Sequence, residues 1–170
     1  MRKNNSQLHS WESYTCRIFF LYCKFHFVSS PGFCLKRLEI SDLPLKDTMK
    51  WRATGQMLLI ASKVKDFLEG KLKILPVGDL DISELTDFER KVLCELRRNV
   101  SFGKTASYSE LAKFAGSPGA SRAVGNVMNK NPFPLFFPCH RIINADGSLG
   151  GFGAGTGLKI KLLENEKKSL

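Results

Sequence analysis

The sequence predicts an α+β protein in which a small mixed α/β N-terminal region, residues 1–85, precedes a mainly helical region, residues 86–170, with a winged helix-turn-helix. Three observations support this fold class. A run rich in Phe and Tyr near the start is typical of β-strands, and the second half contains two helix-capping motifs. The composition, 43% hydrophobic and 25% charged over 170 residues, is that of a globular protein with one domain or two small ones.

The N-terminal region is expected to contain two strands and one helix. Residues 17–28 form the aromatic run, residues 29–32 read Ser-Ser-Pro-Gly and predict a turn, and residues 33–40 return as the second strand. Residues 54–69 carry apolar side chains at helical spacing, with Gly70 placed to cap the helix end. The first ten residues are polar and expected to fray, and residues 71–81 form a connection.

The second half predicts three consecutive helices. Thr86-x-x-Glu89 and Ser107-x-x-Glu110 are capping boxes, each followed by apolar residues on one helical face. A Gly-Ser-Pro-Gly break at residues 116–119 separates the second helix from a third, which starts near Ser121 and ends before Asn131-Pro132. Two short helices joined by a turn that contains Gly predict a helix-turn-helix.

The last forty residues contain an apolar run and a short polar motif. Residues 133–137 are apolar and lead into Pro138-Cys139-His140-Arg141, where a short helical turn is expected. Residues 142–143 predict a short strand, and six glycines between residues 147 and 157 predict a tightly turning loop. Leu158, Leu162 and Leu163 then mark a final helix, with Glu166 near its end.

The charge distribution favours a nucleic-acid partner. The net charge is +10, and no acidic residue occurs between Glu110 and Asp146, a stretch that carries Lys113, Arg122, Lys130 and Arg141. A solvated basic face is the simpler interpretation. The helix-turn-helix in the same stretch, together with small residues such as Ala120, Ala123 and Gly125 that permit close approach to a phosphate chain, makes DNA contact the better one.

The five cysteines predict neither disulfides nor a metal site. Their number is odd, and no C-x-x-C pair occurs. Cys16, Cys23 and His26 are imaginable metal ligands, but small thiols packed in a strand are the simpler interpretation. No apolar run is long enough for a membrane span and no signal-peptide cleavage site is visible, so we expect an intracellular protein.

Cys139 and His140 form the strongest candidate for chemistry. The simpler interpretation of such a pair is a buried structural cysteine beside a surface histidine. A reactive thiol needs a cationic or proton-accepting environment, which Arg141, His140 and a helical turn opening at Pro138 would supply. A cysteine hydrolase is less attractive because its base usually comes from a distant part of the chain.

The motif Pro138-Cys139-His140-Arg141-Ile142 resembles the reactive motif of the O6-alkylguanine-DNA alkyltransferases, also called methylated-DNA–protein-cysteine methyltransferases. Further motifs follow the family's order from residue 86 to residue 166: Phe102-Gly103-Lys104, Ser107-Tyr108-Ser109-Glu110-Leu111-Ala112, Ser121-Arg122-Ala123-Val124-Gly125, Asn131-Pro132 and Leu162-Leu163-x-x-Glu166. The N-terminal half resembles the family's small α/β domain only weakly, and the zinc site of vertebrate members is not recognisable.

The resemblance implies the catalytic roles. Cys139 would accept the alkyl group from O6 of guanine, with O4 of thymine as a second candidate, in an irreversible single turnover without a cofactor. His140 would act as the base through a water, and Glu166 would orient His140. Asn131 would tie the helix-turn-helix to the reactive turn, and Tyr108 would protonate the leaving guanine. The simpler interpretations are that Glu166 is a helix-end carboxylate, that Asn131 is a helix stop and that Tyr108 is a half-buried aromatic residue.

The resemblance also implies the partner, which is double-stranded DNA carrying O6-alkylguanine. The protein would bind it as a monomer, in the nucleoid of a prokaryote or the nucleus of a eukaryote. Arg122 would fill the gap left by the flipped nucleotide. The implied DNA-binding residues are Arg122, Tyr108, Ala123, Gly125, Lys130 and Arg141, and the implied pocket residues are Ile142, Phe152 and Gly153. Many relatives have an aromatic hydroxyl and a residue such as Ser where this chain has Phe152-Gly153, so we expect fewer hydrogen bonds to the lesion and room for bulkier alkyl groups.

Three alternatives remain open. An alkyltransferase-like protein would bind lesions without removing them, but such relatives replace the reactive cysteine, usually with tryptophan. A winged-helix regulator would explain the helix-turn-helix but not the ordered set of Asn131, Cys139, His140 and Glu166. The divergent N-terminal half could also leave the chain inactive.

Overall fold

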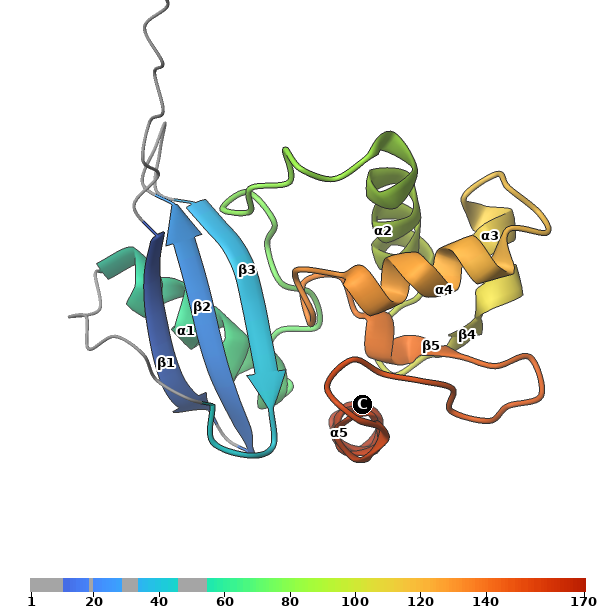
Figure 1. Cartoon of the computed structure of the whole chain (residues 1–170). Coiled ribbons are helices and arrows are strands. Elements are labelled where there is room, and N and C mark those ends of the chain that lie inside the picture. Colours follow the sequence, from blue (N-terminus) through green and yellow to red (C-terminus); the bar gives the residue numbers. More distant parts are fainter. Residues whose placement is uncertain (1–10, 19, 29–33, 46–54) are drawn as a thin grey trace, which may run out of the picture.

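The computed structural model describes residues 11–18, 20–28, 34–45 and 55–170. A three-stranded antiparallel sheet with helix α1 behind it forms one half, and helices α2 to α5 form the other (Figure 1). Strand β3 is the strand nearest the helical half in this view. The expected α+β fold class is confirmed.

The sheet has one strand more than the sequence predicts. Strands β1 (Trp11–Ile18), β2 (Leu21–Val28) and β3 (Cys34–Ser41) are ordered β1-β2-β3, and Ile18 lies opposite Leu21. The single strand expected over residues 17–28 is therefore wrong. The aromatic run reverses direction without any Gly, Pro, Asn or Asp to mark the turn, so its composition hid the reversal.

The second expected strand corresponds to β3, and the expected helix corresponds to α1 (Gly55–Leu68). Side chains of β2 alternate between buried and half-buried positions, as one covered sheet face requires. They share a core with the apolar side of α1, formed by Met57, Ile60, Val64, Phe67 and Leu68. The expected turn at residues 29–32, the expected fraying of the first ten residues and the helix start at Thr54 lie outside the described residues.

The helix-turn-helix and its capping boxes form as predicted. Helix α2 spans Asp87–Asn99, α3 spans Tyr108–Phe114 and α4 spans Ser121–Lys130. The hydroxyl of Thr86 accepts from the Glu89 amide at 3.2 Å, and the hydroxyl of Ser107 accepts from the Glu110 amide at 3.2 Å. These bonds satisfy N–H groups that the first turn of a helix leaves unpaired.

A short strand pair brings the start of α3 to the reactive motif. Strand β4 (Ala106–Ser107) runs parallel to β5 (Ile142–Ile143), with Ser107 opposite Ile143. The 3-10 turn η1 (Cys139–Arg141) leads directly into β5, and helix α5 (Thr156–Lys168) follows the glycine-rich loop. Tyr108 and Cys139, 31 positions apart, are thereby held on neighbouring segments.

The edge of β3 attaches the sheet to the helical half. The amide of Leu38 donates to the carbonyl of Pro132, just after α4, at 2.9 Å, and the amide of Leu35 donates at 2.7 Å to the carbonyl of Asp79 in the connection that leads to α2. Buried residues of both halves belong to one hydrophobic core, so the division at residue 85 stays a prediction from sequence. Among the described helices, none has the length and apolar character that crossing a membrane requires.

Candidate active site

Cys139 opens the η1 turn at the end of the buried apolar segment. Its side chain is 6% exposed, and its amide donates to the carbonyl of Phe137 at 2.7 Å. The guanidinium of Arg97 donates to the carbonyl of Phe136 at 3.1 Å and anchors the segment from α2. The thiol therefore sits on a rigid backbone, as a positioned nucleophile requires.

Asn131, the residue that ends α4, joins the helix-turn-helix to the thiol. Its Nδ2 donates to the carbonyl of Phe137 at 2.8 Å and to Sγ of Cys139 at 3.2 Å. Its Oδ1 accepts from the amide of Phe133 at 3.0 Å. These three bonds fix the amide orientation, so that the amine side faces the sulfur.

The thiol of Cys139 is protonated at rest. Burial raises its pKa, and the hydrogen bond from Asn131 and the positive charge of Lys159 offset this only in part. The expected lowering of this pKa is therefore not found: burial outweighs the opposing contacts, to which His140 contributes only through its backbone and Arg141 not at all. A thiol in this state needs a base to remove its proton during the reaction.

Glu166 of α5 binds the side chains of both His140 and Arg141. Nε2 of His140 lies 2.8 Å from Oε1 of Glu166, and Arg141 donates from Nε to Oε2 at 3.0 Å and from Nη2 to Oε1 at 2.9 Å. The amide of Gly103 donates to the same carboxylate at 2.8 Å. All three side chains are buried. The carboxylate is thus held by two neighbouring side chains and one backbone amide.

The protonation of this cluster follows from its contacts. Burial alone would raise the pKa of Glu166, but the bonds and charges of His140 and Arg141 outweigh it and lower the pKa to about 2. Burial lowers the pKa of His140, although Glu166 opposes the shift. His140 is therefore neutral near pH 7, and its Nε2 carries the proton donated to Glu166. Nδ1, buried without a hydrogen-bond partner among the described residues, is the basic nitrogen.

Arg141 does not reach the surface that would face DNA. Its guanidinium is 4% exposed, is bound by Glu166 and donates to the carbonyl of Val100 at 2.8 Å. Its expected role as a DNA contact is wrong. Buried charges are retained where a partner neutralises them, and the partner here is the carboxylate that also orients His140.

Tyr108, the first residue of α3, lies between α4 and the glycine-rich loop. A Cβ placed on Gly125 would lie 3.9 Å from its ring, and one placed on Gly150 would lie 3.4 Å from its hydroxyl. Burial and the nearby sulfur of Cys139 raise the pKa of Tyr108. Its hydroxyl therefore keeps its proton at neutral pH and can serve as a donor.

A cavity of about 290 Å³ adjoins Cys139. Phe152 and Gly153 line it as expected, together with Asn131 and Pro134. Ile142 does not line it: the side chain is fully buried beside β4. The opposite wall comes from residues 37–40 of β3, which the sequence did not associate with this site because only the fold brings that strand here.

Lys159 is a site residue that the sequence analysis missed. Its side chain is fully buried, and its Nζ donates to the carbonyls of Ile142 at 2.5 Å, of Leu149 and of Gly151 at 3.4 Å. It ties the glycine-rich loop to the reactive turn. The available signal was its spacing, since Lys159 precedes Glu166 by seven residues and so shares a face of α5 with it.

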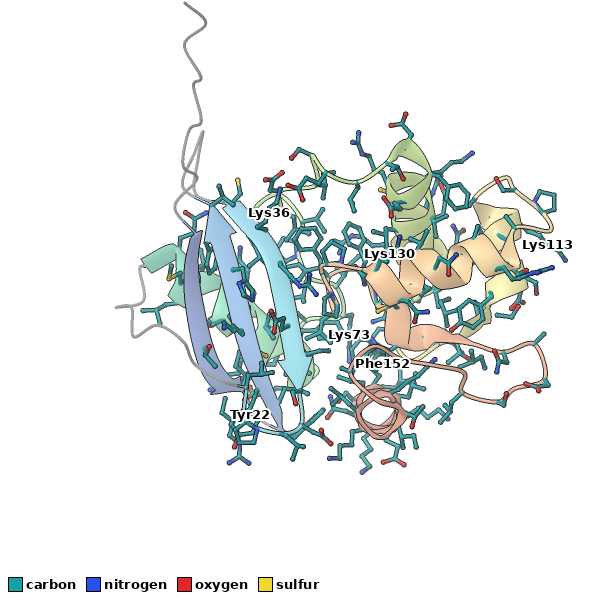
Figure 2. All side chains as sticks on the ribbon, viewed as in Figure 1. Tyr22, Lys36, Lys73, Lys113, Lys130 and Phe152 are labelled. Carbon is teal, nitrogen blue, oxygen red and sulfur yellow. The ribbon has the colours of Figure 1, made fainter. Side chains whose placement is uncertain are left out.

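The remaining predicted residues lie along α4. Arg122, Ala123 and Lys130 are exposed, whereas Gly125 is half-buried against Tyr108. Figure 2 shows Lys113 and Lys130 at opposite ends of the α3–α4 pair, and Phe152 on the loop after β5. The exposed residues of α4 include Arg122 and Lys130, and the helix Ser121–Lys130 contains no Asp or Glu.

The cysteines of the sheet are placed as packed side chains. Cys16 lies opposite Cys23, which is buried, and Nε2 of His26 lies 2.7 Å from Glu39 rather than beside a thiol. Within the described residues, no three His, Cys, Asp or Glu side chains come together in a way that could hold a metal ion.

Comparison with known proteins gives consistent matches. Residues 87–168 match the family model for the DNA-binding domain of 6-O-methylguanine DNA methyltransferase. A methylated-DNA–protein-cysteine methyltransferase of Methanosarcina barkeri is 39% identical over 140 residues, which are 79% of this chain and 80% of the relative. The mouse protein of that name is 43% identical over 93 residues, and the match spans 54% of this chain and 44% of the mouse protein.

The fold agrees with a solved structure over nearly the whole chain. The Mycobacterium tuberculosis protein OGT, solved in complex with DNA, superposes with a TM-score of 0.72 at 31% identity and covers 94% of this chain and 93% of its own. The resemblance inferred from the sequence is confirmed by these matches. The chain belongs to the 6-O-methylguanine DNA methyltransferase family.

Proposed function

We propose that this protein repairs DNA by moving an alkyl group from O6 of guanine to Sγ of Cys139, once per molecule. The observation that carries the proposal is the 3.2 Å contact from Asn131 to Cys139 beside the 290 Å³ cavity. It places a polarised thiol at the edge of a space in which an extruded base can sit. The buried His140–Glu166 pair next to the thiol supplies the base that a protonated thiol requires.

The reaction is a single displacement. The thiol proton passes through a bridging water to Nδ1 of His140, while Glu166 stabilises the imidazolium through Nε2. A bond forms between Sγ and the alkyl carbon as the bond from that carbon to O6 breaks, and the electron pair of the broken bond leaves with guanine. Tyr108 donates a proton to O6 and regains one from solvent, and the imidazolium of His140 returns the thiol proton to solvent. The net change is one proton lost by the thiol and one gained by guanine.

DNA engagement uses the helix-turn-helix. A base inside a duplex cannot present its substituent to a buried thiol, so the nucleotide must leave the stack. Arg122, exposed at the start of α4, would fill the gap, while Ala123, Gly125 and Lys130 lie along the same helix. The M. tuberculosis structure contains DNA, which supports this assignment. Phosphate contacts would dominate the affinity and make binding salt-dependent with little sequence preference.

The proposal includes the partner and its setting. The substrate is double-stranded DNA with O6-alkylguanine, or with O4-alkylthymine as a second donor, and the protein acts as a monomer wherever the genome lies, in a nucleoid or a nucleus. A lesion binder without transfer activity has no use for a thiol held by Asn131. A winged-helix regulator has no use for the buried cluster of His140, Arg141 and Glu166.

Mass spectrometry after incubation with duplex DNA containing O6-methylguanine tests the proposal. We expect one added methyl on the peptide that contains Cys139, repaired DNA rising to one equivalent of protein, and no further product. Cys139→Ala should abolish transfer and keep DNA binding, whereas Cys94→Ala, a change at an exposed cysteine of α2, should leave both transfer and DNA binding unchanged. Repeated turnover without a modified Cys139 would overturn the mechanism.

A further inference from the structure

A second cavity lies beside the reactive turn and shares no lining residue with the cavity at Cys139. It encloses about 430 Å³ between the end of α1, the end of α2 and the apolar segment before Cys139. Pro138 and Arg141 form part of its wall, so any occupant would contact the residue before the nucleophile and the guanidinium that holds Glu166. We propose that this cavity binds a small amphiphilic anion, with a medium-chain carboxylate as the simplest representative.

The inner wall is apolar. It is formed by buried side chains from three separate segments, namely Phe67, Leu75, Phe102, Leu135 and Phe136. Mostly apolar cavities of a few hundred Å³ with a few polar groups are typical of small-ligand sites. The wall therefore fits a short alkyl chain or a single ring.

The mouth of the cavity is cationic. Lys73, Arg97 and Arg98 line it together with Arg141, and none of the lining side chains in the described chain is acidic. Arg141 is neutralised by Glu166, while Arg98 has only a 3.9 Å contact with Glu95. Nζ of Lys73 lies 4.5 Å above the ring of Phe102 and so points its charge along the aromatic wall. Lys73 also donates to the carbonyl of Ser169, and Arg97 donates to that of Phe136, so neither charge is neutralised by an acidic side chain. Three cationic side chains without an acidic side chain in the cavity fit an anionic head group.

Burial lowers the pKa of Arg97, the nearby thiol of Cys94 opposes the shift, and the charge of Arg141 adds to it. An anionic head group would compensate the partly desolvated charge of Arg97. Arg97 already donates to the carbonyl of Phe136, so its orientation toward the cavity is fixed before a ligand arrives. Figure 2 shows Lys73 in the region between the sheet and the helical half.

Exposed apolar side chains mark the same place. Ile74 is 55% exposed and Val77 is 37% exposed. A neighbouring hollow of about 320 Å³ shares Ile74, Arg97 and Arg98 with the 430 Å³ cavity and is also lined by Cys94 and Phe137. Apolar side chains left exposed beside a cationic cavity indicate a surface that a ligand covers. A ligand carboxylate can therefore lie at Arg97 and Arg98 while the ligand's alkyl chain enters either the 430 Å³ cavity or the 320 Å³ hollow.

Cys94 provides a local reporter, because an occupant at Arg97 and Arg98 would shield its thiol. We would measure the rate at which iodoacetamide labels the Cys94 peptide, by mass spectrometry, during a titration with sodium octanoate. Cys34 on β3 is the internal reference. Octanoate should slow labelling of Cys94 saturably and leave Cys34 unchanged, whereas octan-1-ol and octylamine at equal concentration should give no saturable protection.

Two charge reversals on the same helix form the matched pair. Arg98→Glu removes a cation from the mouth, and Arg90→Glu makes the same change at an exposed position outside both hollows. Arg98→Glu should raise the half-protecting octanoate concentration about tenfold or more, and Arg90→Glu should leave it unchanged. The two variants are compared by their half-protecting octanoate concentration, which does not depend on how fast Cys94 reacts without ligand. Circular dichroism verifies that both variants are folded.

Several results would overturn the inference. Equal protection by octan-1-ol would show that the charge is irrelevant, and equal shifts in the two variants would show that the mouth is not the site. Protection of Cys94 by undamaged duplex DNA but not by octanoate would assign this face to nucleic acid. Protection only by vesicles of phosphatidylglycerol would assign it to a membrane surface. Alkyl transfer to Cys139 is measured separately, and its loss would leave this inference unaffected.

Discussion

The side-chain amide of Asn131 donates to the sulfur of Cys139 across 3.2 Å, so the residue that ends the helix-turn-helix holds this thiol. The same Nδ2 donates to the carbonyl of Phe137, which lies two residues before Cys139. In the proposed function, DNA binding and thiol chemistry would therefore meet at a single amide. A thiolate gains more from this donor than a thiol does, because hydrogen bonds to charged groups are the stronger ones.

Asn131→Ala should slow alkyl transfer by roughly 10- to 100-fold, the equivalent of one hydrogen bond to a charged group. Single-turnover rates with duplex O6-methylguanine give the comparison. Asn129→Ala is the matched control, because Asn129 lines the same cavity and, among the described contacts, makes no hydrogen bond to the sulfur. A rate for Asn131→Ala equal to that of the control would limit Asn131 to a structural role.

Glu166→Gln should destabilise the fold by about 3–5 kcal/mol, because Arg141 is left as a buried cation without its partner. Glu164→Gln, on an exposed position of the same helix, should be nearly neutral. Urea unfolding at pH 7 measures both. A loss of less than about 1 kcal/mol for Glu166→Gln would mean that solvent reaches the guanidinium and the cluster is not closed.

The lowered pKa of Glu166 has a consequence for acid stability. The group has an ordinary pKa of 4.5 and a folded-state pKa of about 2, so its contribution to stability is complete above pH 4.5 and is lost as the pH falls toward 2. The free energy of unfolding should decline over this window in the parent protein. Glu166→Gln should show a shallower decline there, and identical slopes would contradict the assignment.

The rate of alkyl transfer should fall on the acid side of pH 6.5. Burial lowers the pKa of His140, so the neutral base persists into mildly acidic solution and is lost only below its ordinary value. His140→Gln should transfer about 10²-fold more slowly and lack this acid limb. An acid limb centred above pH 6.5 would show that Glu166 stabilises the imidazolium more strongly than burial opposes it.

Arg122→Ala should weaken repair of duplex DNA more than reaction with a free alkylated guanine base, because only the duplex requires the nucleotide to be flipped. Rates with both substrates at one salt concentration test this. Arg90→Ala removes an exposed arginine from α2 and serves as the control for net charge. Equal losses on duplex and free base would favour a structural role for Arg122.

Lys159→Met should slow transfer and loosen the glycine-rich loop, because three carbonyl oxygens around Nζ lose their shared donor. Amide hydrogen exchange over residues 144–155 and the single-turnover rate are the two measurements. Lys167→Met changes an exposed lysine of the same helix and should alter neither. Faster exchange without slower transfer would separate the loop from the chemistry.

The sequence by itself determined the local elements whose signals lie within a few residues. The capping boxes at Thr86 and Ser107 form because hydroxyl and carboxylate groups three positions apart satisfy the helix start without any distant contact. The end of α4 at Asn131 follows from the proline after it. The ordered motifs around Cys139 likewise identified the family.

Tertiary structure decided everything that depends on groups far apart in the chain. The hairpin between β1 and β2 was hidden because the aromatic run contains no turn residue, and its register comes from pairing across the sheet. Arg141 appeared to be a surface cation, but Glu166, 25 residues away, draws it into the core. Lys159 and the β3 wall of the cavity were likewise invisible in the sequence. Local patterns specify backbone shape and residue type, whereas burial and partners set the pKa and the direction of a side chain, and these exist only once distant segments have packed together.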